Sequence, residues 1–265
     1  MAKYAYLPHT GIFLYHRAVE KYILIEKREG ETPLQALERL RATRTDLRDV
    51  PMTYAGRLDP MATGTLAILV GEECKNKDAY TGLDKEYEFE ILFGVSTDTG
   101  DILGRITEYA ALQPGIPFEE IVQEGTWTLP YPAYSSKTVD GVPLFRHAIE
   151  GRLHDIKIPV RDMSVRSAAY IGARTMTGTV IRAEVMRRIG LLRYDTHGPK
   201  ENDFRENLVR ASWDDFPDGV YTVARYRAVV TGGTYIRTIV EEASRRMRMP
   251  ALAYSIKRTR IIGLR

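Results

Sequence analysis

The sequence contains only one cysteine, Cys74, and no long run of apolar residues. A single cysteine cannot build a disulfide framework within the chain, which fits a reducing compartment. No apolar run approaches the length needed to cross a bilayer. The first residues also lack the basic, apolar and small-residue regions of a signal peptide. We therefore expect a cytoplasmic protein with no membrane partner.

Several common catalytic patterns are missing as well. The chain has no Walker loop, no GxGxxG after a predicted strand and no serine-hydrolase elbow. Neither HxxxH nor HExxH spacing occurs among the five histidines, which are His9, His16, His147, His154 and His197. The acids of Ser96–Asp101 lack the spacing of a calcium loop and are more typical of a hairpin turn. The sequence therefore predicts no metal site.

Positive charge is concentrated in two regions, although the formal net charge is only +3. Residues 157–193 carry eight basic and two acidic residues, a balance of +6, and residues 243–265 carry seven basic residues and no acid. The rest of the chain therefore carries 3 − 6 − 7 = −10. Such asymmetry indicates a polyanion-binding surface on an acidic body. A solvated arginine-rich face explains the same charges equally well.

The spacing of apolar residues predicts both strands and helices. With 265 residues, the chain is long enough for one large domain or one domain with an added lobe. We expect strands at residues 11–15, 66–70, 85–95 and 219–231. In residues 85–95, aromatic and aliphatic residues alternate with Glu86, Glu88 and Glu90, so one face should be buried and the other exposed.

Two helices have clear starting signals. Thr32, Pro33 and Gln35 supply a cap, a proline at the first helical position and a capping-box glutamine. A second helix, over residues 235–247, should follow a tight Gly-Gly turn, with Arg237 near its start and off its apolar face. Residues 180–192 also look helical and are rich in arginine, and residues 194–207 look like a polar surface loop.

The stretch YAGRLDPMATG, residues 54–64, holds one carboxylate, Asp59, with an arginine before it and a proline after it. Taken alone, an aspartate before proline is a common turn residue. The stretch nevertheless strongly resembles the catalytic loop of the TruB-type tRNA pseudouridine synthases. Four more blocks resemble that family in the same order: GLDKEY with GVSTDTGD (82–101), YSSKTVDG (134–141), GTYIR (233–237) and KRTRIIG (257–263). Five ordered blocks over roughly residues 11 to 264 identify the chain as a member rather than a coincidental match.

The resemblance implies a role for each matching residue. Asp59 would attack the uridine at C6 of the base or at C1′ of the sugar, or assist through a glycal-like route. Arg237 would pair with Asp59, and Tyr87 would stack on the flipped base and remove its C5 proton. Without the resemblance, Tyr87 would be interpreted as a core aromatic and Arg237 as a surface partner of Glu241. The family also implies substrate-binding residues, which are Tyr54, Arg57, Tyr235, Ile256 and Lys137.

Three positions depart from the family pattern. Tyr54 stands where the family usually has histidine, and it keeps a flat surface and a hydrogen-bonding tip but no imidazole charge. Arg57 stands where threonine is frequent, and Ile256 where leucine is usual. An early block, KPxGxTS in the family, is only partly kept in residues 27–33.

The resemblance also implies an architecture and a substrate. We expect an α+β pseudouridine synthase fold with a mixed, mainly antiparallel central sheet, formed by one catalytic domain over residues 1–265. Residues 131–155 would form an RNA-gripping arm, and residues 172–210 a basic insertion atypical of the family. The chain ends soon after the KRTRIIG block, so we expect no C-terminal PUA domain. The implied protein is a monomer without cofactor or metal that binds the T-arm of tRNA and isomerises the T-loop uridine at position 55.

Two other functions stay open. One is a synthase for another RNA, such as ribosomal or messenger RNA, as in the related dyskerin branch. The other is an RNA-binding or tRNA-folding protein without catalysis. A pure binder has no need of Asp59, Tyr87 and Arg237 together, so the sequence favours an enzyme.

Overall fold

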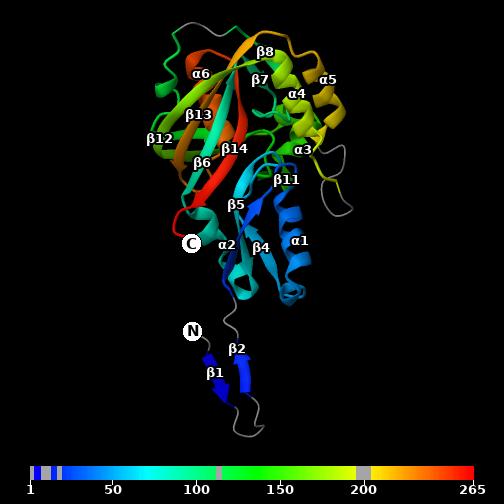
Figure 1. Ribbon diagram of the computed structural model, residues 1–265, viewed down its shortest axis with the longest axis vertical. Helices are drawn as coiled ribbons and strands as arrows, with labels where there is room; N and C mark the ends of the chain where they lie inside the picture. Colours follow the sequence, from blue (N-terminus) through cyan, green and yellow to red (C-terminus); the bar gives the residue numbers. More distant parts are fainter. Residues whose placement is uncertain (1–2, 7–12, 17–19, 112–114, 195–203) are drawn as a thin grey trace.

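One eight-stranded sheet gathers strands from most of the chain (Figure 1). The computed structural model describes residues 3–6, 13–16, 20–111, 115–194 and 204–265. The strands of this sheet are β3 (Tyr22–Lys27), β4 (Met52–Ala55), β5 (Thr63–Val70), β6 (Lys85–Phe93), β9 (Gly125–Pro130), β12 (Val160–Thr177), β13 (Val220–Val230) and β14 (Ala251–Ile261). They lie in the order β3-β5-β14-β6-β13-β12-β9, with β4 also paired to β5. Only β5 and β14 pair in parallel, so the predicted α+β fold with a mixed, mainly antiparallel sheet is confirmed.

Strand β6 lies at the centre of the sheet and has the predicted alternation. Its side chains Tyr87, Phe89, Ile91 and Phe93 are buried, whereas Glu86, Glu88 and Glu90 are only partly covered. The strand ends at Phe93. The chain then leaves the sheet in a separate hairpin of β7 (Val95–Thr97) and β8 (Ile106–Tyr109), which confirms the predicted turn near residues 96–101.

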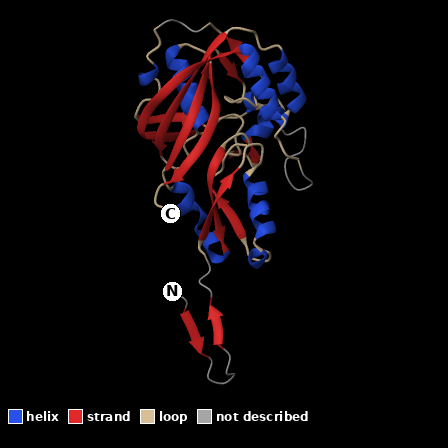
Figure 2. Ribbon diagram, in the orientation of Figure 1, coloured by secondary structure: helices blue, strands red, loops and turns tan. Residues whose placement is uncertain are grey.

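Helix α6 (Ile236–Met247) covers one face of the sheet (Figure 2). As predicted, its apolar residues Ile236, Ile239, Val240 and Ala243 are buried, and they pack in one cluster with aromatic side chains of β6 and β13. Burying an aliphatic side chain of this size contributes about 1.5–3 kcal/mol. The packing therefore holds the start of α6, and with it Arg237, firmly against the sheet.

Helices α4 (Gly178–Ile189) and α5 (Glu206–Asp214) cover the opposite face. Ile181, Val185 and Trp213 are fully buried there. They pack in one cluster with strand residues such as Leu92 and Val223, whose side chains point away from the α6 face because side chains alternate along a strand. The expected insertion therefore contributes to the core, and its expected limits, residues 172 and 210, fall inside β12 and α5. The predicted loop over 194–207 lies partly outside the described residues.

The N-terminal half adds helices to the other end of the sheet. Helix α1 (Pro33–Thr43) begins with the predicted capping box at Thr32 and packs on β5, and α2 (Lys77–Gly82) lies on the far side. Strands β1 (Lys3–Tyr6) and β2 (Phe13–His16) pair with each other. Short 3-10 helices cover Thr45–Leu47, Gly71–Asn76, Phe118–Glu120 and Leu153–Asp155.

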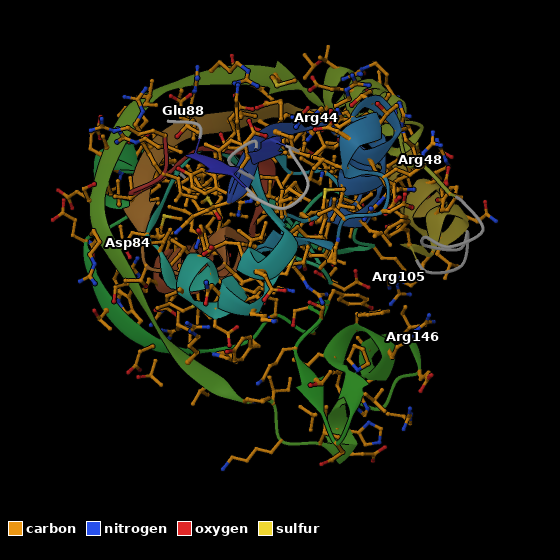
Figure 3. The ribbon with its side chains drawn as sticks, turned by 90° about the horizontal axis from the view of Figure 1, so that it is seen from below. Arg44, Arg48, Asp84, Glu88, Arg105 and Arg146 are labelled. Carbon is orange, nitrogen blue, oxygen red and sulfur yellow. The ribbon has the colours of Figure 1, made fainter. Side chains whose placement is uncertain are left out.

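The predicted arm connects β9 to β12, two strands that lie side by side. It contains β10 (Thr138–Val139), β11 (Val142–Pro143) and α3 (Leu144–Ile149). A hydrogen bond from Tyr131 N to Pro159 O closes its base at 3.0 Å. Figure 3 shows the arm, with Arg146 labelled on it, standing out from the rest of the molecule.

Candidate active site

Asp59 lies in the loop between β4 and β5, and two glycines shape that loop. Gly56 and Gly64 both have positive φ, +76° and +105°, a region that favours glycine. A Cβ on Gly64 would lie 2.2 Å from the carbonyl oxygen of Arg258. Only glycine fits this close approach of β5 to β14, so the exit of the loop is fixed against the sheet.

Lys27 supports the same loop from the end of β3. Its ammonium group is fully buried and donates to the carbonyl oxygens of Arg28 (2.9 Å), Pro60 (3.0 Å) and Ala62 (2.6 Å). Burial lowers the pKa of Lys27 to about 8, although the nearby carboxylates oppose this shift. The partly kept early block, residues 27–33, thus contacts the loop that carries Asp59, a contact that the sequence alone did not indicate.

Arg237 binds Asp59 through two parallel hydrogen bonds. Its Nε lies 2.8 Å from Oδ2 and its Nη2 lies 3.0 Å from Oδ1, an arrangement that fixes both the position and the orientation of the carboxylate. Its other bonds go to the carbonyl oxygens of Thr99 (2.8 Å) and Tyr134 (3.1 Å). The Arg237 side chain is only 4% exposed, so the alternative of a surface pair with Glu241 is wrong.

A second carboxylate, Asp101, lies beside this pair. Its Oδ2 is 3.7 Å from Arg237 Nε, and its Oδ1 accepts from Leu103 N (2.9 Å) and Thr99 Oγ1 (2.7 Å). Burial raises the pKa of Asp101, and the Arg237 charge opposes that rise. For Arg237, burial by itself lowers the pKa, but Asp59 and Asp101 raise it above its ordinary value. Sequence reasoning placed Asp101 only in a turn, because nothing local distinguishes it from Asp98.

A cavity of about 440 Å³ opens above Asp59, a volume within the usual range for ligand sites. Seven of the eight predicted site residues line it, namely Tyr54, Arg57, Asp59, Tyr87, Tyr235, Arg237 and Ile256. Lys137 is not among the lining residues and is exposed on the arm. Its Nζ lies over the ring of Tyr131, 5.5 Å from the centroid, and that ring packs edge-on against Tyr235.

Flat and apolar side chains form much of the wall. Tyr87 and Ile256 come from the paired strands β6 and β14 and are 7% and 9% exposed. Tyr235 precedes α6, and burial, reinforced by the Asp59 charge, raises the pKa of its hydroxyl. Tyr54 lies on β4 with the Lys77 ammonium 5.2 Å from its ring centroid. Aromatic faces of this kind can stack on a base that has left its own stack.

The structure adds lining residues that were not among the predicted site residues. Tyr134 and Ser135 come from the base of the arm, and Phe204 and Arg205 precede α5. No local pattern marks Phe204 or Arg205, because their position depends on how α4 and α5 fold back over the sheet.

Much of the basic charge predicted to bind a polyanion is paired with carboxylates. Arg174 pairs with Glu90, and Arg188 pairs with Glu29. Figure 3 labels Asp84 and Glu88, which lie on the side of the molecule where β12 curves around the sheet. Asp84 pairs there with Arg166 at 3.5 Å. The positive charge of the basic region over residues 157–193 is therefore partly neutralised by neighbouring carboxylates.

Within the part of the chain that the structure describes, no three histidine, cysteine, aspartate or glutamate side chains are grouped to hold a metal ion. Among the same residues, no helix is both long and apolar enough to cross a membrane.

Comparisons with known proteins relate the sequence of this chain to one family. The family model described as TruB family pseudouridylate synthase (N terminal domain) matches residues 44–186. The tRNA pseudouridine synthase B of Bacillus cytotoxicus is 27% identical over 246 residues, which cover 91% of this chain and 66% of that protein. The protein of the same name from Borreliella burgdorferi is 33% identical over 141 residues, 51% of this chain and 48% of that protein. The chain thus spans about half to two thirds of the length of these relatives.

One comparison is with a solved structure, a Cbf5-Nop10-Gar1 complex. A chain of that complex aligns with 91% of this chain and 48% of its own length, at 14% identity and a TM-score of 0.49. The family model matches the amino-acid sequence, not the structure. Its match begins just before β4 and ends within α4. Because that model matches more than half of the residues, the chain belongs to the TruB family of pseudouridylate synthases.

Proposed function

We propose that this protein converts uridine to pseudouridine in tRNA, and that its target is the T-loop uridine at position 55. The observation that carries the proposal is the Asp59 carboxylate, held by two bonds from buried Arg237 under a cavity with aromatic walls. The names of the relatives, tRNA pseudouridine synthase B, support tRNA as the substrate.

The reaction needs one nucleophile and no redox partner. The N1–C1′ bond breaks, a C5–C1′ bond forms, the proton at C5 is lost and N1 gains one, so atoms and electrons balance. Asp59 attacks as a nucleophile at C6 of the base or at C1′ of the sugar, or it assists through a glycal-like route. Arg237 fixes the orientation of the Asp59 carboxylate, and the Asp59 side chain remains 30% exposed and lines the cavity.

The walls of the cavity suit a flipped uridine. Tyr87 stacks on the base and its hydroxyl takes the C5 proton, while Ile256 and Tyr235 close the pocket around the ring. Tyr54 and exposed Arg57 lie at the cavity and contact the neighbouring nucleotide. Lys137, on the exposed side of the arm, binds phosphate.

The arm clamps the T-arm of the tRNA. Residues 131–155 stand out from the sheet, and their base reaches the active site through the Tyr134 carbonyl oxygen that accepts from Arg237. RNA gripped by the arm is thereby brought next to Asp59. The protein acts as a monomer in the cytoplasm, and residues 172–210 supply a further contact to the RNA.

Tritium release from T-arm RNA labelled at C5 of uridine tests the proposal. Isomerisation must expel that label, so the wild-type protein should release it and Asp59→Asn should not. Asp46→Asn is the matched control, because Asp46 is an exposed aspartate that pairs with Arg44 and does not line the cavity.

The same assay separates the alternatives. Equal release from unrelated hairpins would show a synthase with another RNA target. Binding of the T-arm without release, by both the wild type and Asp59→Asn, would show a protein that binds RNA without modifying it.

A further inference from the structure

Arg205 lies at the edge of the cavity, in a segment outside all the family-like blocks. It directly precedes α5 and has a positive φ of +51°, in the left-handed region that non-glycine residues seldom occupy. Its side chain is only 12% exposed. A strained backbone persists only where surrounding contacts determine it, and such residues cluster at functional sites.

Two contacts hold the Arg205 guanidinium. Its Nη1 and Nη2 donate to the two carboxylate oxygens of Asp98 at 2.7 and 3.0 Å. Its plane also lies over the ring of Tyr134, 4.3 Å from the centroid. The contacts thus join the turn after β7, which contains Asp98, to the base of the arm, which contains Tyr134.

The same two segments supply the carbonyl oxygens that hold Arg237. Thr99, the neighbour of Asp98, accepts from Arg237 Nη1 at 2.8 Å, and Tyr134 accepts from Nη2 at 3.1 Å. Arg205 thus contacts Asp98, the neighbour of Thr99, and it contacts Tyr134 directly. The two carbonyl oxygens that orient Arg237 therefore belong to the segments that Arg205 holds.

We propose that Arg205 is a positioning residue, which joins these two segments and so keeps Arg237, and through it Asp59, in the geometry that the reaction needs. Its catalytic consequence rests on the function proposed above, whereas its effect on Arg237 does not. The 204–210 segment, which belongs to the expected insertion, is on this view part of the catalytic support.

The first test replaces Arg205 by lysine and by alanine. Lysine keeps the charge beside Asp98 but lacks the planar fork that binds two oxygens and stacks on a ring. Arg210→Lys and Arg210→Ala are matched controls, because Arg210 lies on α5 and pairs with Glu206 at 2.7 Å, away from the cavity lining. Single-turnover tritium release and the Kd for T-arm RNA are measured for each variant.

A small misplacement of a catalytic group lowers rates by up to about 100-fold, so both Arg205 variants should lose roughly 10- to 100-fold in rate with little change in Kd. The Arg210 variants should match the wild type. A wild-type rate for Arg205→Lys and Arg205→Ala would overturn the proposal. So would a weakened Kd with an unchanged rate, which would make Arg205 an RNA contact instead.

A second readout needs no activity. Hydrogen exchange of the Arg237 Nε–H is followed by NMR in the RNA-free protein, where the bond to Asp59 should protect it. The proposal expects this protection to be lost in Arg205→Lys and in Asp98→Asn, and kept in Arg210→Lys; kept protection in all three would overturn it. If the wild type releases no tritium, the proposed function fails, and exchange alone decides the role of Arg205. If Arg205→Ala does not fold, Arg205→Lys and Asp98→Asn provide the test.

Discussion

The ammonium group of Lys27 donates a 2.6 Å hydrogen bond to the carbonyl oxygen of Ala62, three residues after Asp59. A second bond, to the carbonyl oxygen of Pro60, holds the residue directly after Asp59. Because Lys27 ends β3, the loop that presents the carboxylate is anchored to the sheet.

Replacing Lys27 by methionine should destabilise the protein and slow tritium release. The buried carbonyl oxygens lose their donor, and an unsatisfied buried polar group costs about 1–3 kcal/mol. Urea unfolding measures the free energy. Lys75→Met, at a lysine whose side chain is 75% exposed, should change it by no more than about 0.5 kcal/mol. Equal stabilities for Lys27→Met and Lys75→Met would contradict this account.

Because Lys85 is buried, the free energy of unfolding should depend on pH. Its ammonium is buried against the carbonyl oxygens of Tyr80, Thr81 and Leu83, and burial, helped by the Arg258 charge, lowers the pKa of Lys85 from 10.5 to about 8. Between these values the unfolded chain binds more protons than the folded one, so this group's contribution to the free energy of unfolding rises with pH.

Urea unfolding of the wild type and Lys85→Met from pH 7 to 9.5 checks this sign. The free energy of the wild type minus that of the variant should increase by up to about 1.4 kcal/mol per pH unit above pH 8. A difference that stays constant or falls would show that Lys85 keeps its ordinary pKa in the folded protein.

Arg237→Lys should lower the single-turnover rate by about 100-fold or more, because lysine cannot bind both oxygens of Asp59. Arg246→Lys, on the same helix, is the matched control, because Arg246 donates to Gln123 and the Ile121 carbonyl oxygen instead. It should retain the wild-type rate. A fully active Arg237→Lys would mean that a single charge near Asp59 is sufficient.

Helix α4 offers a test of the core. Ile181 is fully buried and its neighbour Val180 is 51% exposed. Ile181→Ala should lower the free energy of unfolding by about 2–5 kcal/mol through the cavity it leaves, whereas Val180→Ala should change it by about 0.5 kcal/mol or less. Equal effects in urea unfolding would show that the helix is peripheral to the fold.

RNA binding should weaken steeply with salt, because most contacts are expected to be to phosphate. Each neutralised phosphate contributes about −0.7 to −0.9 to the slope of log K against log salt. Lys137→Ala should therefore reduce that slope by about one such unit, and Lys75→Ala should leave it unchanged. An unaltered slope for Lys137→Ala would remove Lys137 from the RNA contacts.

Elements with strong local signals were predicted well from the sequence. The capping box at Thr32 and the alternation of β6 are properties of a few adjacent residues, and both occur in the structure as predicted. The expected insertion was harder to interpret, because a basic helix with an apolar face has the same sequence pattern whether it lies on the surface or packs against the core. The burial of Ile181 and Val185 decided between these possibilities.

The sequence by itself determined several strands and helices, such as β6 and α6, and, through the order of its motifs, the family and the residues to examine. Only the tertiary structure decided what surrounds Asp59, because its neighbours are distant in the chain. Arg237 is 178 residues from Asp59 and Lys27 is 33 from Pro60, and they meet through strand pairing and the packing of α6. Arg205 joins them through the helices on the opposite face of the sheet, a position that no local pattern specifies.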